Sequence, residues 1–143
     1  MVRLHAARAA AVAPSIAPIK TPLKTHRYLF LQGQISHFFA ELGRALYRRG
    51  HAVHRIHFNS GDARFWTLPG AVSFRGGAAD WPDFFTACLA DWGITDVILF
   101  GDCRPRHAMA IPLARARGVR VHVFEEGYLR PDFVTLERDG VNG

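Results

Sequence analysis

The chain contains little cysteine, and this scarcity excludes several classes of protein. Among its 143 residues the only two cysteines are Cys88 and Cys103, and they do not form a CxxC spacing. A disulfide scaffold or a cysteine-rich zinc module is therefore disfavoured, and we expect a reducing compartment. Cys88 lies on the apolar face of a predicted helix. Cys103 lies in a polar loop where Arg104 alone would lower its pKa, so a nucleophilic role is not favoured.

Long apolar runs and nucleotide-binding fingerprints are absent as well. No run approaches the roughly 18 apolar residues that cross a bilayer. Neither GxGxxG nor GxxxxGK[ST] follows the first predicted strand, where the sequence reads Gln32-Gly-Gln-Ile-Ser. An NAD enzyme or a P-loop NTPase is thus disfavoured. This turn either only connects a strand to a helix, or it presents the backbone N–H groups of the helix N-terminus to a bound anion.

Acidic residues are missing from residues 1–27, which contain five of the 18 basic side chains. The whole chain carries a formal charge of +6, but the other residues hold 13 basic against 12 acidic groups. Because the remainder is nearly neutral, a nucleic-acid-binding surface is disfavoured. Pro14, Pro18 and Pro22 exclude a long helix. We expect a basic, Ala/Pro-rich disordered extension over 1–27, either solvated or attracted to anionic lipid.

Residues 28–143 have the composition and periodicity of one folded α/β domain, with 49% hydrophobic residues in the whole chain. Predicted helices alternate with predicted strands, which is typical of a Rossmann-like parallel sheet with flanking helices. The predicted strands are 28–32, 51–58, 71–74, 97–100 and 119–124. The predicted helices are one after Ser36 as N-cap that ends before Gly50, one over 81–92, and one that begins at Pro105 or at Pro112. Asn59-Ser-Gly-Asp predicts a turn.

Polar clusters follow two of these predicted strands. Because ligands bind outside the carboxyl ends of parallel strands, we expect a cleft there. Two adjacent carboxylates, if desolvated, resist simultaneous ionisation, so one pKa could rise into the range of a general base. The alternative is a pair of exposed acids matched to arginines at 130 and 138. The clusters are Gly101, Asp102, Arg104 and His107, then Glu125, Glu126, Gly127 and Arg130.

Histidine is common, with eight residues, but the pattern does not predict a metal site. His51, His54 and His57 lie three residues apart on one predicted strand and so alternate between its faces. His107 lies one helical turn from Asp102, where a solvated histidine at a helix terminus is the simpler interpretation. We expect no metal.

Four sequence blocks resemble the capsular polysaccharide biosynthesis/export family, which includes bacterial β-Kdo glycosyltransferases that begin the lipid linker of capsules. The resemblance covers about residues 28–143, with the blocks in the same order and at similar spacing. The blocks are Phe30-Leu-Gln-Gly-Gln, Arg49-Gly-His-Ala-Val-His-Arg-Ile-His-Phe-Asn, Leu99-Phe-Gly-Asp-Cys-Arg-Pro and Val123-Phe-Glu-Glu-Gly-Tyr-Leu-Arg-Pro-Asp.

The resemblance implies a two-domain, GT-B-like architecture in which this chain is a truncated N-terminal, acceptor-side Rossmann-like domain. It implies transfer of Kdo from CMP-Kdo to a phosphatidylglycerol-type lipid, without a cofactor, by a cytoplasmic protein that can be peripheral at the inner membrane. The later motifs that would hold CMP, including a His-Pro element, are not among the 143 residues. We therefore expect transfer from a longer protein and an inactive fragment here.

The resemblance also assigns roles to the polar clusters. Glu126 or Glu125 is the expected acid/base or acceptor-activating group, and Asp102 is placed with them. The expected substrate-binding residues are Gln32, Gly33, Arg104, Gly127 and Arg130. The alternative function is a non-catalytic Rossmann-like module that binds a partner of the capsule export machinery or an anionic membrane surface.

Overall fold

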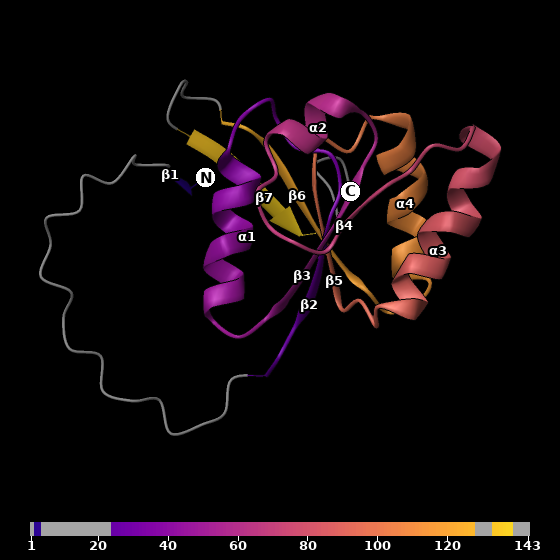
Figure 1. Ribbon diagram of the computed structural model, residues 1–143, viewed down its shortest axis with the longest axis horizontal. Coiled ribbons are helices and arrows are strands. Elements are labelled where there is room, and N and C mark those ends of the chain that lie inside the picture. The colour runs from indigo at the N-terminus through magenta and orange to yellow at the C-terminus, as the bar shows by residue number, and fades with distance from the viewer. Residues whose placement is uncertain (1, 4–23, 128–132, 139–143) are drawn as a thin grey trace, which may run out of the picture.

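A seven-stranded, mostly parallel sheet forms the centre of the computed structural model, which describes residues 2–3, 24–127 and 133–138 (Figure 1). The strand order is β1-β7-β6-β5-β2-β3-β4. Strands β4, β3, β2, β5 and β6 are parallel, whereas β7 is antiparallel to β6 and to β1. The bounds are β1 Val2–Arg3, β2 Arg27–Phe30, β3 Ala52–His57, β4 Ala71–Ser73, β5 Asp96–Phe100, β6 Arg120–Glu126 and β7 Phe133–Arg138.

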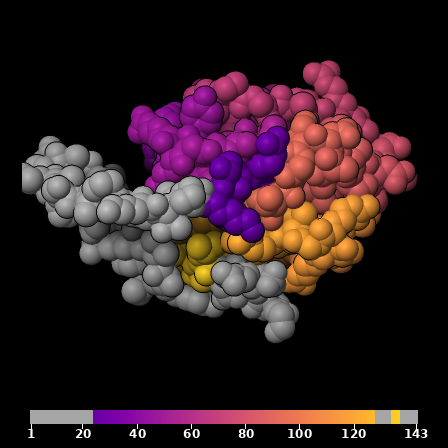
Figure 2. Space-filling model, turned by 90° about the horizontal axis from the view of Figure 1, so that it is seen from below, coloured from indigo at the N-terminus to yellow at the C-terminus, as the bar shows by residue number. Residues whose placement is uncertain are grey.

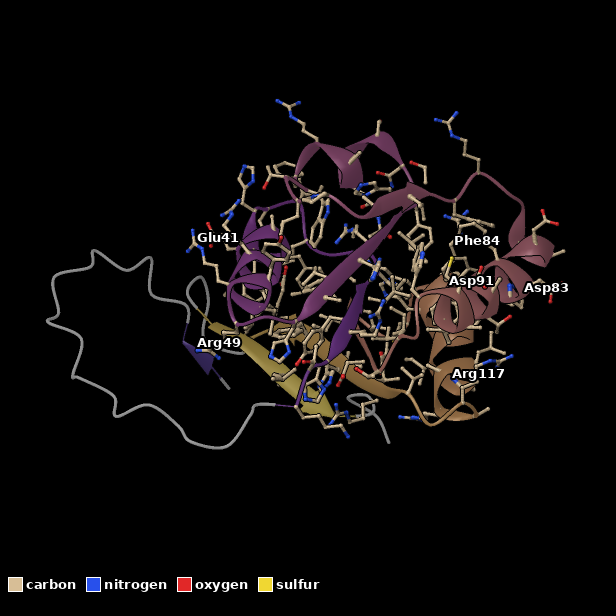
Figure 3. All side chains as sticks on the ribbon, turned by 60° about the horizontal axis from the view of Figure 1, so that its bottom comes forward. Glu41, Arg49, Asp83, Phe84, Asp91 and Arg117 are labelled. Carbon is tan, nitrogen blue, oxygen red and sulfur yellow. The ribbon has the colours of Figure 1, made fainter. Side chains whose placement is uncertain are left out.

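Helices cover both faces of the sheet, α1 on one face and α3 with α4 on the other (Figure 1). In Figure 3 the labelled Glu41 of α1 lies on the opposite side of the sheet from Phe84 and Asp91 of α3. The bounds are α1 Phe38–Arg48, α2 Ser60–Arg64, a 3₁₀ turn η1 Ala78–Asp80, α3 Trp81–Asp91 and α4 Pro105–Arg115. This layering confirms the predicted Rossmann-like α/β class.

The two faces of the sheet hold separate apolar clusters. Strand β5 is buried along its whole length, because alternate residues contact different layers. Val97 and Leu99 pack in the cluster beneath α3 and α4, whereas Ile98 and Phe100 pack in the cluster beneath α1. The unbroken apolar run in the sequence therefore reflects a central strand covered on both sides.

Most of the predicted elements are confirmed, and the differences have local causes. Helix α4 begins at Pro105 and continues through Pro112, since Ala116 N still donates to Pro112 O at 3.0 Å. The predicted turn at Asn59 is instead a helix N-cap, where its Oδ1 accepts from Asp62 N at 2.9 Å. The N-cap of α1 is the residue after Ser36, and Ser36 Oγ accepts from Phe38 N at 3.4 Å.

The ends of the chain differ more from expectation. Strand β7 was not predicted, because its six residues carry only a weak alternation; Val134 is nevertheless 3% exposed and packs in the α1-side cluster. Within the expected disordered extension, Val2–Arg3 form β1 against β7, and Arg27 begins β2. Residues 4–23 lie outside the described part.

Candidate functional site

The carboxyl ends of β2 and β5 form the topological switch point of the sheet. From β2 the chain proceeds outward to β3 and β4, then returns to β5 on the other side of β2. In such sheets the crevice outside these two strand ends is the usual ligand site. Phe100 N donates to Gln32 O at 3.1 Å, so the loops that follow the two strands start side by side. Predicted site residues Gln32, Gly33 and Asp102 therefore share one edge.

Gly33 permits the β2–α1 loop to approach the first turn of α1. A Cβ at this position would lie 2.7 Å from Cδ2 of Phe39, which is closer than real Cβ contacts allow. The ring of Phe39 is itself 4% exposed and belongs to the α1-side core. The glycine is thus required by close packing, and any larger residue would move this loop.

A small pocket lies behind the Gly33 loop. Its volume is about 10 Å³, room for one water-sized group. It is lined by Gly33, Gln34, Ser36, Phe39, Arg55, Asp62, Phe65 and Trp66. The pocket links the predicted loop to side chains of β3 and α2 that are far away in the sequence.

Arg55 is the charged group at the centre of this pocket and was missed by the sequence analysis. Its side chain is 4% exposed, and Nη2 lies 3.9 Å from Oδ1 of Asp62. Burial lowers the pKa of Arg55 to about 10, and the charge of Asp62 acts in the opposite direction. Arg55 Nε and Trp66 Nε1 are buried donors without a partner among the described atoms. The pocket can therefore hold one hydrogen-bond acceptor.

The loop after β5 brings Asp102 and Cys103 together. Gly101 has φ +74°, which favours glycine, and Cys103 Sγ donates to Asp102 Oδ1 at 3.2 Å. The pKa of Cys103 is raised by this hydrogen bond and by the charge of Asp102, and less by the charge of Glu125. Cys103 therefore stays a thiol, in line with the expectation that it is not a nucleophile. Gly101 N donates to Phe124 O at 2.8 Å, so this loop starts beside the end of β6, where Glu125 follows Phe124.

Glu125 and Glu126 are the last two residues of β6, opposite Thr135 and Val134 of β7. Consecutive residues of a strand point to opposite faces of the sheet. Glu125 and Glu126 therefore point to opposite faces of the sheet, because β6 extends through Glu126 and does not end at Phe124 as the sequence pattern predicted.

The residues just before them show which face each glutamate occupies. Val123, which shares a face with Glu125, packs in the cluster beneath α3 and α4. Phe124, which shares a face with Glu126, packs against Phe38 of α1 at 5.4 Å between ring centroids. Glu125 thus lies on the side of α3 and α4, and Glu126 lies on the side of α1.

The other predicted site residues have more peripheral positions. Arg104 is exposed and precedes α4, where its carbonyl accepts from Ala108 N at 2.8 Å. Gly127 is buried directly after β6. Arg130 lies outside the described residues, as does the side chain of Arg138. The alternative of exposed acids matched to these two arginines therefore stays a prediction.

His107 is fully buried rather than solvated, so the expectation of an exposed helix-terminus histidine is wrong. Its Nδ1 donates to Gly101 O at 2.6 Å, which fixes the loop that carries Asp102. Burial lowers the pKa of His107 to about 4, so the ring is neutral near neutral pH. Its Nε2 has no partner among the described atoms. His107 acts on the site by positioning the loop.

The opposite, amino-terminal edge of the sheet carries a second polar cluster, which the sequence analysis missed. Figure 2 shows this face, with the start of β2 in indigo beside the orange segment that contains β6. Asp96, at 1% exposure, begins β5 and is the central acceptor. Its donors are Arg120, His122, Thr95 and His26. The cluster joins the starts of three strands and lies away from the switch-point edge.

The described residues contain neither a metal-ligating cluster nor a membrane-spanning helix. No group of three or more His, Cys, Asp or Glu side chains is arranged to hold a metal ion in the part of the chain that the structure describes. Within 2–3, 24–127 and 133–138, no helix has the length and apolar character needed to cross a membrane.

The chain is similar to known capsule proteins. The family described as "Capsule polysaccharide biosynthesis protein" matches residues 95–143. The chain is 39% identical over 116 residues to "Capsule polysaccharide modification protein LipB" of Neisseria meningitidis, in strains of serogroups A and B, which covers 80% of the chain and 28% of LipB. It is 34% identical over 120 residues to "Capsule polysaccharide export protein KpsS" of Escherichia coli, which covers 84% of the chain and 31% of KpsS.

A weaker likeness exists to a solved structure, the Bordetella bronchiseptica enzyme WbmH in complex with NAD+. The TM-score is 0.48 at 16% identity, over 66% of this chain and 37% of that chain, and this level of likeness says nothing of function. The chain spans less than a third of the length of the LipB and KpsS relatives. Because LipB and KpsS are 39% and 34% identical to it over 80% and 84% of its length, the chain belongs to the capsule polysaccharide biosynthesis family.

Proposed function

We propose that this chain supplies the acceptor-side domain of an enzyme that transfers Kdo from CMP-Kdo to a phosphatidylglycerol-type lipid during capsule synthesis. The observation that carries the proposal is that the paired strands β5 and β6 end beside the switch point with carboxylates. Asp102 follows β5, Glu125 lies at the end of β6, and Gly101 N donates to Phe124 O at 2.8 Å. The capsule relatives LipB and KpsS support the biological setting. The donor would be held by a part of the protein beyond these residues.

The geometry favours Glu125 over Glu126 as the group that activates the acceptor hydroxyl. Glu125 lies on the α4 side of the sheet, and the loop that contains Asp102 leads into α4, whereas Glu126 lies on the α1 side. A carboxylate that removes the proton of an attacking hydroxyl typically contributes about 10²–10⁴-fold to the rate. Asp102 would lie beside it and hold the acceptor by a hydrogen bond. Gln32 and Gly33 would form the neighbouring wall.

The test is a chimera in which this chain replaces the matched 116 residues of the Neisseria LipB relative. LipB and the chimera are supplied with radiolabelled CMP-Kdo and phosphatidylglycerol, and labelled lipid is measured. We expect transfer by both, with Glu125→Gln in the chimera reducing the rate by about 10²-fold or more. Glu126→Gln is the matched control, an identical exchange at the next residue on the opposite face, and we expect a smaller loss.

Three outcomes would contradict the proposal. Absence of Kdo transfer by LipB and the chimera alike would remove the assigned reaction. Undiminished transfer after Glu125→Gln would remove the assigned role of that carboxylate. A larger loss from Glu126→Gln than from Glu125→Gln would move the chemistry to the α1 side of the sheet.

We also propose that the basic N-terminal stretch contacts an anionic membrane surface, where a lipid acceptor would be found. The supporting observation is the presence of five basic and no acidic side chains in residues 1–27. Each basic residue near an anionic surface contributes about 1 kcal/mol, and salt screens the attraction. Binding to phosphatidylglycerol vesicles should weaken when Arg3, Arg8, Lys20 and Lys24 are replaced by Gln and when salt is raised. Binding that is independent of both would contradict this contact.

A further inference from the structure

The small pocket behind the Gly33 loop, which we call the Arg55 pocket, contains two buried donors that bond to no described atom. Arg55 is 4% exposed and Trp66 is 8% exposed, and both line the pocket. Arg55 Nε and Trp66 Nε1 have no hydrogen-bond partner among the described atoms. Guanidinium and indole N–H groups donate hydrogen bonds and cannot accept them. A ligand of this pocket must therefore be an acceptor.

The two donors are held in place by packing. Arg55 Cζ lies 5.3 Å from the centroid of the Trp66 ring and 5.9 Å from that of Phe39. Both rings belong to the α1-side core. Gly43 of α1 comes so close to the indole that a Cβ there would lie 2.8 Å from Cη2 of Trp66. The guanidinium and the indole are thus preorganised, and a ligand does not have to order them when it binds.

Asp62 balances the charge of Arg55 only in part. Its Oδ1 lies 3.9 Å from Arg55 Nη2, which is beyond hydrogen-bond distance, and its Oδ2 accepts from Phe58 N at 2.9 Å. No other acid is present among the described residues that line the pocket. A buried charge is costly unless it is both paired and hydrogen-bonded. An anion at Arg55 Nε therefore stabilises the guanidinium more than a water molecule does.

The first turn of α1 adds positive potential at the same place. This helix has 11 residues, and Ser36 and Phe39 bring its start to the lining of the pocket. The first backbone N–H groups of a helix have no partner within it, and the helix dipole favours negative charge there. The helix terminus and the buried arginine thus favour the same kind of ligand.

The size of the pocket limits this ligand to a single atom. Its volume is about 10 Å³, the space of one water-sized group. A phosphate, a carboxylate or a sugar does not fit into this space. We propose that the Arg55 pocket is a chloride site that fixes the Gly33 loop against β3 and α2. This inference does not depend on Kdo transfer, because the pocket lies behind the loop and is not lined by the carboxylates assigned to that reaction.

The experiment replaces sodium gluconate by sodium chloride at constant ionic strength and follows the ¹⁵N-labelled chain by NMR. The three tryptophans give three indole N–H signals, which single Trp→Phe variants assign. We expect saturable shifts of the Trp66 indole and of the amides of Gly33 and Ser36. The Trp81 indole should not shift, because its Nε1 already donates to Arg106 O at 2.9 Å.

Two outcomes of this titration would overturn the proposal. Absence of a saturable shift with chloride means that the pocket holds water only. Inorganic phosphate at the same ionic strength should leave the three reporter signals unchanged. A response to phosphate equal to that to chloride would place the anion outside the pocket.

Variants separate binding from folding. Trp66→Phe keeps a ring and every charge but removes one donor, so chloride should bind about tenfold more weakly, as read from the Gly33 and Ser36 amides. Trp92→Phe is the matched control, because Trp92 packs in the cluster beneath α3 and α4, and chloride affinity should not change. Equal chloride affinity of the two variants would overturn the assignment.

Arg55→Met tests the charge itself. Chloride should raise the thermal unfolding midpoint of the wild-type chain at constant ionic strength, because a ligand of the folded state stabilises it. The same exchange of salts should leave the midpoint of Arg55→Met unchanged. An equal chloride effect on both chains would show a general salt effect and overturn the site. If Arg55→Met does not fold, the comparison of Trp66→Phe with Trp92→Phe decides.

Discussion

Asp96 and Arg120 begin two neighbouring parallel strands and form a bidentate ion pair between them. Arg120 Nε lies 2.8 Å from Asp96 Oδ1, and Arg120 Nη2 lies 2.9 Å from Asp96 Oδ2. The two residues are direct partners in the register of β5 and β6, so the pair fixes the relative position of the strands at their starts. This alignment also sets where the same strands end, and those ends carry Asp102 and Glu125.

Replacement of Asp96 is expected to destabilise the fold. Asp96→Asn leaves its former donors without a charged acceptor, and breaking a buried pair costs about 3–5 kcal/mol. We expect the lower end of this range, because Arg120 is partly exposed and can be rehydrated. Urea denaturation measures the loss. Arg120→Gln should cost less, since His122, Thr95 and His26 still donate to Asp96, and the reverse order would contradict the central role of Asp96.

The same carboxylate gives the fold a dependence on acid. Burial alone would raise the pKa of Asp96, but hydrogen bonds from His122, Thr95, Arg120 and His26 outweigh it and hold this pKa far below its usual range. Its stabilisation is complete above the ordinary carboxyl pKa of about 3.9 and is lost as pH falls below that value. The difference in unfolding free energy between wild type and Asp96→Asn should therefore shrink below about pH 4. A constant difference would contradict the lowered pKa.

His107 is expected to make the stability of the fold depend on pH in a second, less acidic range. Because its pKa is lowered from 6.5 to about 4, the unfolded chain binds a proton between these values that the folded chain does not. Stability should fall as pH drops through this window, by up to about 3 kcal/mol. Denaturation of wild type and of His107→Gln at about pH 7 and pH 4.5 measures it. The glutamine variant should lose less stability between the two conditions, and an equal loss would exclude His107 as the cause.

Gly33 is expected to tolerate no side chain. Gly33→Ala places Cβ 2.7 Å from Phe39 Cδ2, and relief of such an overlap typically costs about 1–3 kcal/mol. Gly77→Ala is the matched control, since its nearest contact would be 3.5 Å away at Asp80 Oδ2. Thermal denaturation should show a clear loss for the first and a change within about 0.5 kcal/mol for the second. Combining Gly33→Ala with Phe39→Leu should recover part of the lost stability. If the double variant recovers none of it, the overlap with Phe39 is not the cause of the loss.

The reactivity of Cys103 reports which carboxylates surround the loop after β5. Asp102→Asn should increase the alkylation rate of Cys103 at neutral pH, because the charge and hydrogen bond that raise its thiol pKa are removed. Glu125→Gln should give a smaller increase and Glu126→Gln less still, because Glu126 lies on the other face. Iodoacetamide labelling followed by mass spectrometry measures the rates. Buried Cys88, whose pKa burial raises to about 11, serves as the unreactive internal control. A larger response to Glu126→Gln than to Glu125→Gln would contradict the proposed site.

The α/β class and most of the elements were determined by local sequence patterns. The unbroken run Val97-Ile-Leu-Phe100 identifies a strand that is buried on both faces. Gly50 and Gly118, which have a left-handed backbone conformation, mark the ends of α1 and α4. Each of these patterns lies within a few residues, so the element that it predicts can be identified without knowledge of the fold. Strand β7 was not predicted, because it forms by pairing with β6 and a local sequence pattern does not show which strands pair.

The switch-point edge was predictable in outline, because parallel strands end at a common edge and polar residues there are visible in the sequence. What only the tertiary structure decided is which side chains meet. Strand pairing through Glu126 separates the two glutamates onto opposite faces, and packing buries Arg55 behind the Gly33 loop. The Asp96 cluster joins residues from distant segments, such as His26 and Asp96. Contacts of this kind depend on strand register and on how the helices pack on the sheet, and neither can be deduced from the sequence of one chain.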